Sequence, residues 1–242
     1  MRRRLVRWAG WLLVTLLAAT MLAPFLVMLS TSLMDEFEVF HYPPSLLPAK
    51  PQWANYARAL TALPFHRFFA TSLAFAVIVV AGQVATAATA GYAFARLRFP
   101  GRDRLFGLTL GVMMVPMIVI LIPRFLLINA LGWVDTLQGL AATELVSVWG
   151  IFLLRQAFLV LPGELEDAAR LDGAGDWGIF WHVALPSVRP ALATLALFAF
   201  VDAWKNYLWP LIATRSLEMR TVEVLFSTNC QPSRKALVFL PG

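Results

Sequence analysis

Two short stretches of this largely apolar chain combine acidic and basic side chains at close spacing, and neither stretch is arranged for catalysis. The first, EDAARLDGAGDWGIFWHVALP at residues 166–186, turns from acidic to basic to glycine-rich between two apolar runs. The second, DAWKNYLW at residues 202–209, carries an acid and an amine three residues apart. Covalent catalysis needs a nucleophile beside a base, and nucleotide binding needs a GxxxxGK[ST] loop. The sequence offers no usable pattern of either kind, so we expect no catalytic residue.

Metal chemistry is not indicated either. The single cysteine, Cys230, cannot form an intrachain disulfide, and no group of Cys and His has metal-ligand spacing. The histidines at positions 41, 66 and 182 are isolated from one another. We therefore expect no metal site and no cofactor bound by this chain.

The stretch 202–209 has three interpretations. Charged side chains at membrane depth are energetically costly, so Asp202, Lys205 and also Glu144 are functional candidates by default. Asp202 and Lys205, at i and i+3, can simply neutralise each other. The stretch can also contact a sugar by hydrogen bonding and ring stacking. Its aromatic rings are equally typical of anchors at the membrane surface, which is the interpretation that we favour for them. The candidate residues of a translocation pathway are Asp202, Lys205, Asn206 and Trp209.

The elements that must position these residues are membrane helices. Apolar residues make up 60% of the 242 residues and charged residues 14%, against roughly 45–50% and 25% in soluble domains. A bilayer core about 30 Å thick requires about 20 apolar residues in a helix. The sequence therefore predicts an all-α, polytopic membrane helical bundle with five spans. They cover approximately residues 8–33, 68–94, 105–127, 137–161 and 190–212.

Local features refine these spans. The apolar run after MRRRLVR is longer than the core of a signal peptide, so we expect an uncleaved first helix. The segment 34–66 contains five prolines and is predicted to be an external loop with short turns. In the second span, GQVATAATAGYAFA at 82–95 is rich in the small residues that allow close helix packing in lipid.

The distribution of arginines predicts the orientation. Four arginines lie in the first seven residues and four more lie between residues 96 and 104, whereas the segment 34–66 has few basic residues. The positive-inside rule then places the N-terminus in the cytoplasm, together with the loop between the fourth and fifth spans. The net charge of +6 is explained by these flanks, and we expect no nucleic-acid partner.

That loop, residues 162–189, is called the charged loop below. Residues 162–173 are predicted to form a short helix, with acidic residues in its first turn and Gly173 as its terminator. Leu165, Ala168 and Ala169 fall on one side of it. From the residues alone, three roles remain open: a solvated loop, a helix lying on lipid, and a helix that docks on another protein. The acidic polar face disfavours the lipid interpretation, because such helices are usually basic.

A known motif matches the charged loop. Asp167-Ala168-Ala169 is followed by three residues, Gly173, nine residues, Val183, one residue and Leu185-Pro186. This pattern resembles the EAA motif of ABC-importer permease subunits, with Asp in place of Glu and Val in place of Ile. The resemblance implies a coupling helix that docks on a cytoplasmic ATPase. The ATPase-coupling residues that it implies are Glu166, Asp167, Ala168, Ala169, Asp172, Gly173, Ala174, Leu185 and Pro186.

Other segments narrow the resemblance to the carbohydrate-importer branch, and most closely to its MalG-like permeases. These segments are AGYAFARLRFPGR at 90–102, LGWVDT at 131–136, GIFLLRQAF at 150–158 and DAWKNYLWPLI at 202–212. The resemblance implies the type I ABC importer permease fold in the bacterial inner membrane. It also implies a second permease subunit, a cytoplasmic ATPase dimer that binds the ATP and Mg, and an extracytoplasmic solute-binding protein. An importer of a non-sugar solute and an ion-coupled secondary transporter are the alternatives.

The resulting organisation has three parts. Residues 1–66 form the first span and external loop, residues 67–213 form the permease core with the charged loop, and residues 214–242 form an atypical tail. The family that the chain resembles has six spans, and the tail is too polar to supply the sixth. We therefore expect the tail to be truncated or altered in reading frame.

Overall fold

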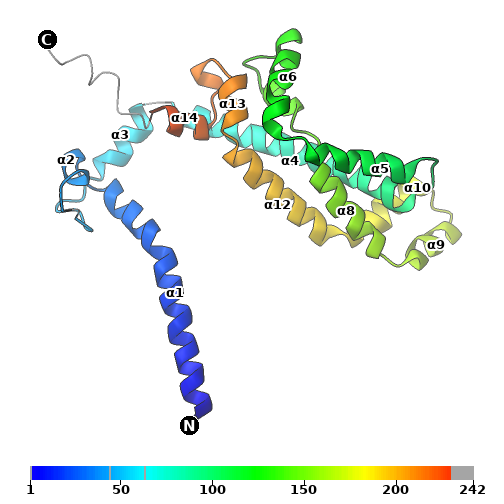
Figure 1. The fold of residues 1–242 in the computed structure, drawn as a ribbon, viewed down its shortest axis with the longest axis horizontal. Helices are drawn as coiled ribbons and strands as arrows, with labels where there is room; N and C mark the ends of the chain where they lie inside the picture. The colour runs from blue at the N-terminus through cyan, green and yellow to red at the C-terminus, as the bar shows by residue number, and fades with distance from the viewer. Residues whose placement is uncertain (1, 44, 63, 230–242) are drawn as a thin grey trace. The chain divides into compact units, whose positions relative to one another are not determined.

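The structure is a computed structural model that describes residues 2–43, 45–62 and 64–229, and all regular secondary structure in these ranges is helical (Figure 1). The chain divides into two compact units, Met1–Phe65 and His66–Gly242. The predicted all-α fold class is confirmed. Within the described residues, two helices are long and apolar enough to cross a membrane, and up to five spans result if each sharply bent helix pair counts as one.

The first unit contains one long helix and two short ones. Helix α1 (Arg2–Ser32) continues through Pro24, and none of its apolar stretch Gly10–Ser32 is buried. The loop that follows contains α2 (Glu36–Val39) and α3 (Ala54–Ala62). Asn55 ties this loop together, since its side-chain amide donates to the carbonyls of Ser32 at 3.0 Å and Met34 at 2.9 Å.

The second unit is built around α4 (Phe65–Arg96). The elements that follow are α5 (Arg102–Gly111), η1 (Val112–Met114), α6 (Met117–Ala130), α7 (Leu137–Ala142), α8 (Val148–Val160), α9 (Gly163–Leu171), α10 (Asp176–Ile179), the π-helical turn η2 (Phe180–Ala184), α11 (Leu185–Ser187), α12 (Arg189–Lys205), α13 (Leu208–Ala213), η3 (Leu217–Met219) and α14 (Val222–Asn229).

Small residues allow α4, α8 and α12 to pack side by side (Figure 1). A Cβ atom added to Gly91 of α4 would lie 3.0 Å from the backbone nitrogen of Arg155 in α8. A Cβ atom added to Gly150 of α8 would lie 2.8 Å from Leu195 of α12. The predicted role of the small residues in the second span is thereby confirmed, because side chains at these positions would push the helices apart.

Three of the predicted spans are not the continuous helices that we expected. The third bends by 98° between η1 and α6, next to Pro116. The fourth is interrupted at residues 143–147, between α7 and α8. The fifth is interrupted between α12 and α13, where Pro210 has no N–H to donate to the carbonyl four residues earlier. Prolines and polar residues therefore break helices that hydropathy alone presents as single runs.

Two apolar cores lie along the second unit. The core nearer the charged loop contains Ala87, Ala88, Tyr92, Phe94, Ala95, Phe106, Ile151, Leu154, Phe158, Phe180, Ala184, Val188 and Leu195. The other contains Phe75, Ala76, Val79, Leu121, Ile128, Leu140, Ala141, Ala203, Trp209 and Ala213. Among the described residues, α4 contributes several buried residues to both cores and α12 contributes one to each, so these two helices link the two ends of the unit.

The described part of the tail packs on the beginning of α4. The backbone N–H of Val222 donates to the hydroxyl of Ser72 at 2.9 Å, and Arg67 pairs with Glu218 at 2.6 Å. Thr221, Val224 and Leu225 are buried. Residues 230–242, including Cys230, lie outside the described residues, so the expectation of a missing sixth span stays a prediction.

Candidate functional site

Helix α9 begins and ends as the sequence predicts. Its first turn contains Glu164 and Glu166, where the positive end of the helix dipole favours acidic side chains. At its other end, Gly173 adopts a left-handed conformation with φ 87°. The N–H of Ala174 donates to the carbonyl of Ala169 at 2.9 Å, and that of Gly173 to the carbonyl of Arg170 at 3.0 Å. These two bonds form a Schellman cap, which fixes where the chain turns away from the helix.

The residues of the EAA-like motif do not all face the same way. Asp167, Ala168 and Asp172 are exposed, and Ala169 is half-buried. Glu166, by contrast, is buried against the body of the second unit. The exposed side of α9 is therefore available to another molecule, whereas Glu166 is directed away from it.

The second half of the charged loop leads back into the bundle. A π-helical turn, η2, immediately precedes Leu185-Pro186. Proline cannot donate the usual helical hydrogen bond, and a widened turn accommodates this loss. The chain then bends by 76° into α12. Leu185 and Pro186 are half-buried, so they shape the bend and are not part of the exposed face of α9.

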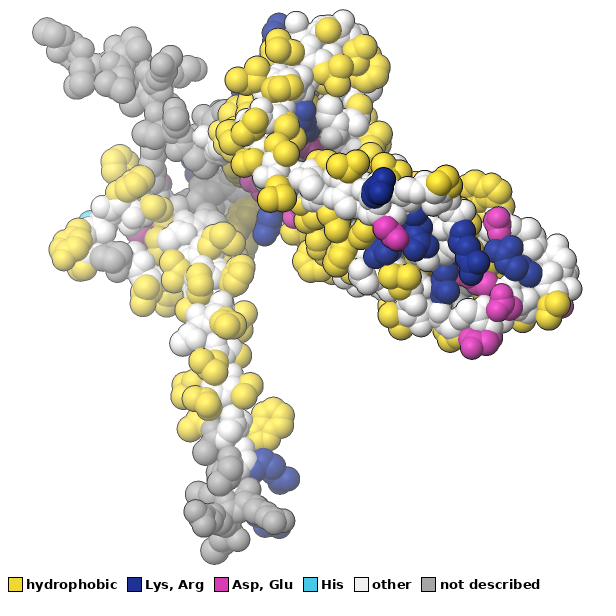
Figure 2. Space-filling view, turned by 45° about the vertical axis from the view of Figure 1, so that its right-hand side comes forward, with side chains coloured by type: hydrophobic (Ala, Val, Ile, Leu, Met, Phe, Trp, Pro, Cys, Tyr) yellow, Lys and Arg dark blue, Asp and Glu magenta, His cyan; other side chains and the backbone are white. Residues whose placement is uncertain are grey.

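Charged side chains gather at the end of the second unit that carries α9 and the beginning of α5 (Figure 2). A cleft of about 790 Å³ lies there, between the end of α4 and α9. Both signs of charge line it, so this end offers a polar surface on an otherwise apolar unit. Its charged lining residues are Arg96, Arg98, Arg102, Glu166, Asp167, Arg170 and Asp176.

A second polar cluster lies where the predicted fourth span is interrupted. The interruption leaves backbone carbonyls without helical partners, and a membrane interior provides no water to satisfy them. Two side chains of α4 satisfy them instead. Gln83 donates to the carbonyl of Glu144 at 2.8 Å, and Thr86 donates to the carbonyl of Leu145 at 3.0 Å. The break is thus built into the packing of α4 against the α7–α8 connection.

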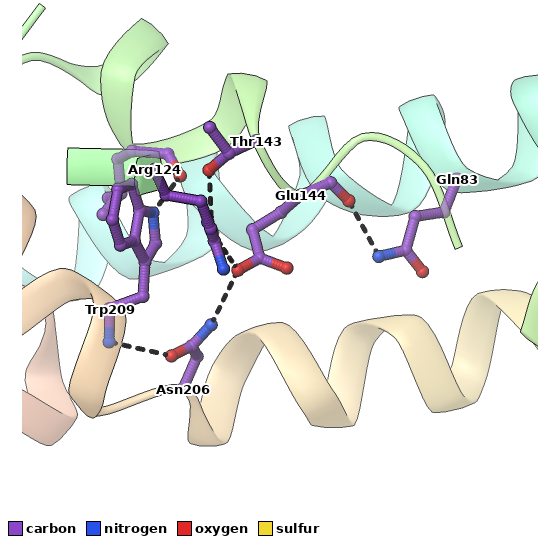
Figure 3. Close-up of polar contacts among 7 residues, drawn as sticks. Gln83, Arg124, Thr143, Glu144, Asn206 and Trp209 are labelled. Carbon is purple, nitrogen blue, oxygen red and sulfur yellow. Dashed lines mark hydrogen bonds and ion pairs between the residues drawn. The ribbon is translucent and has the colours of Figure 1, made fainter. Parts of the chain in front are cut away.

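An ion pair lies at the centre of this cluster (Figure 3). Arg124 of α6 donates to the carboxylate of Glu144 at 2.6 Å and to the hydroxyl of Thr143 at 2.7 Å. The side chains of Arg124 and Glu144 are only 12% and 21% exposed. The amide of Asn206 lies 3.4 Å from the same carboxylate. The guanidinium of Arg124 also lies 4.1 Å from the ring centroid of Trp209, a cation–π contact.

The pathway candidates are distributed differently from our expectation. Trp209 is fully buried and its indole N–H donates to the carbonyl of Leu140 at 2.9 Å, so its ring is neither a surface anchor nor open to a solute in this conformation. Asn206 belongs to the Arg124–Glu144 cluster. Asp202 and Lys205 are exposed, and none of the ion pairs among the described residues joins them.

Sequence reasoning missed several residues that the structure brings into these sites, among them Gln83, Arg96 and Arg124. Gln83 interrupts an apolar run, which was a usable signal of a buried polar role. Arg96 and Arg124 were considered only as flanking charges. Their partners lie far away in the sequence, so spacing alone does not reveal the pairs.

The second unit is thus a helical body with a capped, exposed helix at its charged end, and comparison with known proteins identifies the class of transport protein to which it belongs. The profile of the family described as binding-protein-dependent transport system inner membrane component matches residues 1–231. The chain belongs to this family.

Relatives support the assignment. The sn-glycerol-3-phosphate transport system permease protein UgpE of Yersinia pestis bv. Antiqua (strain Antiqua) is 31% identical over 223 residues, covering 88% of this chain and 79% of that protein. The arabinooligosaccharides transport system permease protein AraQ of Bacillus subtilis (strain 168) is 34% identical over 168 residues, covering 69% and 60% of the two chains.

A solved structure agrees as well. The crystal structure of a bacterial ABC transporter involved in the import of the acidic polysaccharide alginate includes a chain that is 26% identical to this one. The TM-score is 0.83, and the match covers 97% of this chain and 84% of that chain. The protein is therefore a multi-pass permease of the ABC importer class.

Proposed function

We propose that this permease moves a carbohydrate or a related polyhydroxylated solute and that the charged loop couples its movement to ATP hydrolysis on a separate ATPase chain. The observation that carries the proposal is the exposed face of α9. Asp167 and Ala168 lie on this face, between the acidic first turn of α9 and its Schellman cap. The chain also belongs to a family of transport-system membrane components. Relatives that transport glycerol phosphate and arabinooligosaccharides support the solute class.

The coupling proposal has a mechanical basis. Small side chains on the exposed face allow an ATPase surface to approach α9 closely. Closure of two ATPase subunits on ATP would pull such helices together and bias the permease between inward-open and outward-open arrangements. ATP and Mg would be bound by the ATPase chains, so this chain serves as a conduit and a transmission element.

The proposed assembly contains a second permease subunit, a cytoplasmic ATPase dimer and an extracytoplasmic solute-binding protein. Its orientation has the N-terminus and α9 in the cytoplasm, supported by the arginines at residues 2–7 and 96–104. Asp202, Lys205 and Asn206 remain our candidates for the pathway. Asp202 and Lys205 are exposed and have no ion-pair partner in the described chain, so they are the better placed of the three to meet a solute.

Substitution of the capping glycine tests the coupling role. A β-branched residue cannot easily adopt the φ of 87° at Gly173, so Gly173→Val should displace the end of α9. We expect ATP-driven uptake by the assembled importer to fall by about tenfold or more, which corresponds to the strain of an unfavourable backbone conformation. Uptake would be measured in vesicles with sn-glycerol 3-phosphate and arabinooligosaccharides as probes.

Gly175 supplies the matched control. It has an extended backbone with φ −77°, and an added Cβ atom would meet nothing within 4 Å. Gly175→Val should therefore leave uptake close to that of the unmodified protein. Equal uptake by the Gly173→Val and Gly175→Val proteins would refute the coupling role of the α9 cap.

A further inference from the structure

Glu166 of helix α9, one of the ATPase-coupling candidates, is directed inward. The side chain of Glu166 is 12% exposed, whereas its neighbours Asp167 and Ala168 are exposed. Successive residues of an α-helix are rotated by about 100° around its axis. A residue that faces the bundle and a residue that faces a partner can therefore be adjacent. Glu166 is thus placed to connect the exposed face of α9 with the body of the unit.

Arg96, the last residue of α4, is the partner of Glu166. Its Nε lies 3.3 Å from Glu166 Oε1, and its side chain is 16% exposed. The same guanidinium donates a hydrogen bond to the carbonyl of Leu161. Leu161 is the C-cap residue that follows α8, immediately before the 74° bend into α9. One side chain therefore contacts α9 and the point about which α9 is bent.

The contact is electrostatic and is not locked by hydrogen-bond geometry. Arg96 Nε and Glu166 Oε1 face each other, yet neither atom has a hydrogen-bond partner in the described residues. In the ion pair at the centre of the second polar cluster, by contrast, Arg124 donates an aligned hydrogen bond of 2.6 Å to Glu144. A Coulombic contact is less directional than a hydrogen bond, so it persists through small rotations of α9.

We propose that the Arg96–Glu166 pair is the joint that transmits movement of α9 to α4. This inference rests on the proposed coupling function. Covalently, α9 joins the unit only through short connections at residues 161–163 and 172–175. Helix α9 also contacts α10, where Arg170 pairs with Asp176 at 2.7 Å. Of the ion pairs among the described residues, however, Arg96–Glu166 is the one that joins α9 to α4, so a pull on the exposed face can reach α4 through it. Helix α4 contributes to both apolar cores, so a displacement of its end reaches the whole unit.

Neutralising Glu166 tests the joint. Glu166→Gln keeps the shape of the side chain and removes the charge that attracts Arg96. In the complex of this chain with its ATPase and second permease, we expect the ATPase still to co-purify. Stimulation of ATP hydrolysis by the loaded binding protein should fall about tenfold, because the attraction that carries the movement of α9 to α4 is removed.

Glu164 supplies the control for this experiment, because it lies in the same first turn and is exposed. Glu164→Gln should leave stimulation unchanged. Equal stimulation in the Glu164→Gln and Glu166→Gln complexes would overturn the inference, and so would loss of the ATPase from the Glu166→Gln complex alone. If the unmodified chain itself failed to retain an ATPase, the proposed function would fail before the joint was tested.

A crosslink separates transmission from folding. In a Cys230→Ser background, Arg96→Cys and Glu166→Cys together remove the pair and provide two thiols. We expect this complex to be uncoupled and a short, cleavable bifunctional thiol reagent to restore stimulation. Cleaving the reagent should abolish it again. A crosslinked complex that stays uncoupled would contradict the inference, because the mechanical connection would then be present without the effect.

Discussion

Among its described residues, the second unit contains two largely buried ion pairs that differ in how firmly they are held. Arg124–Glu144 has an aligned hydrogen bond of 2.6 Å, a hydroxyl from Thr143 and a cation–π contact with Trp209. Arg96–Glu166 is 3.3 Å long and is not aligned as a hydrogen bond. The first pair fixes a break within the apolar bundle, whereas the second lies at a bend beside an exposed helix. Burial of an ion pair alone therefore does not distinguish a fixed anchor from a joint that moves.

The difference follows from the surroundings of each pair. A pair within a membrane bundle gains more from hydrogen bonds made inside the protein, because no water is available there. Arg124 makes two such bonds, to Glu144 and Thr143, and only its Nε is buried without a hydrogen-bond partner among the described residues. A pair beside an open charged cleft has other charges and solvent nearby, so it tolerates looser geometry. We expect substitutions in the Arg124–Glu144 cluster to affect stability and those at Arg96–Glu166 to affect coupling.

The largest loss of stability is expected for Arg124→Ala. It leaves Glu144 as an uncompensated buried charge and removes the contact with Trp209, at a cost of about 3 kcal/mol. The thermal unfolding of the purified protein in detergent would measure the loss. Arg104 is exposed, and Arg104→Ala should change the unfolding temperature little. Similar losses from both substitutions would show that Arg124 is not an anchor.

A somewhat smaller loss is expected for Gly139→Ala, which tests the support of the same cluster. An added Cβ atom would overlap the carbonyl oxygen of Trp133, so α7 would have to move. Helix α7 leads directly to Thr143 and Glu144, and we expect destabilisation of about 2 kcal/mol. Gly107 of α5 has open space around it, so Gly107→Ala is the control. An unchanged unfolding temperature for Gly139→Ala would show that α7 adjusts freely.

The contrast between the pairs is sharpened by Glu166→Gln, for which we expect a loss of stability of only about 1 kcal/mol. The loss is small because Arg96 contacts Glu166 less closely than Arg124 contacts Glu144, and because both Arg96 and Glu166 line the open charged cleft. Thermal unfolding in detergent would measure the loss of stability for Glu166→Gln and for Glu144→Gln, and the two losses would be compared. Larger destabilisation by Glu166→Gln than by Glu144→Gln would reverse our assignment of anchor and joint.

An effect as small as that of Glu166→Gln, and one that depends on pH, is expected at Asp135, which fastens the described part of the tail to the α6–α7 connection. Its carboxylate accepts hydrogen bonds from the N–H groups of Arg215 at 2.8 Å and Ser216 at 3.0 Å, and from the hydroxyl of Ser216. Desolvation raises the pKa of Asp135, but these bonds and the charge of Arg215 outweigh it and lower the pKa below its ordinary value of 3.8.

Because the folded-state pKa of Asp135 is lowered, its stabilising effect is complete above the ordinary value and is lost as the pH falls through the lowered one. Asp135→Asn should therefore destabilise the protein at pH 7, by about 1 kcal/mol, and the difference from the unmodified protein should shrink below about pH 4. Asn tolerates the φ of 64° at this position, so the substitution isolates the charge. Unfolding scans at both pH values measure the difference, and a constant difference would exclude this role.

Much of the fold and of the charged loop was predictable because it depends on neighbours in the sequence. Membrane helices follow from runs of apolar residues, and the cap of α9 follows from Gly173 and its immediate surroundings. The spacing of Asp167, Gly173 and Pro186 identified the motif. These features involve hydrogen bonds and burial within a few turns of one helix, so the sequence determines them by itself.

The tertiary structure alone decided which distant residues meet. Arg124 reaches Glu144 across a broken span, and Arg96 reaches Glu166 across the bend into α9. It also buried Trp209, whose position near the end of an apolar run had indicated an exposed ring. Hydropathy reports how apolar a residue is, but it does not report its neighbours. The packing of α4 against the broken helices sets those contacts, and with them the difference between an anchor and a joint.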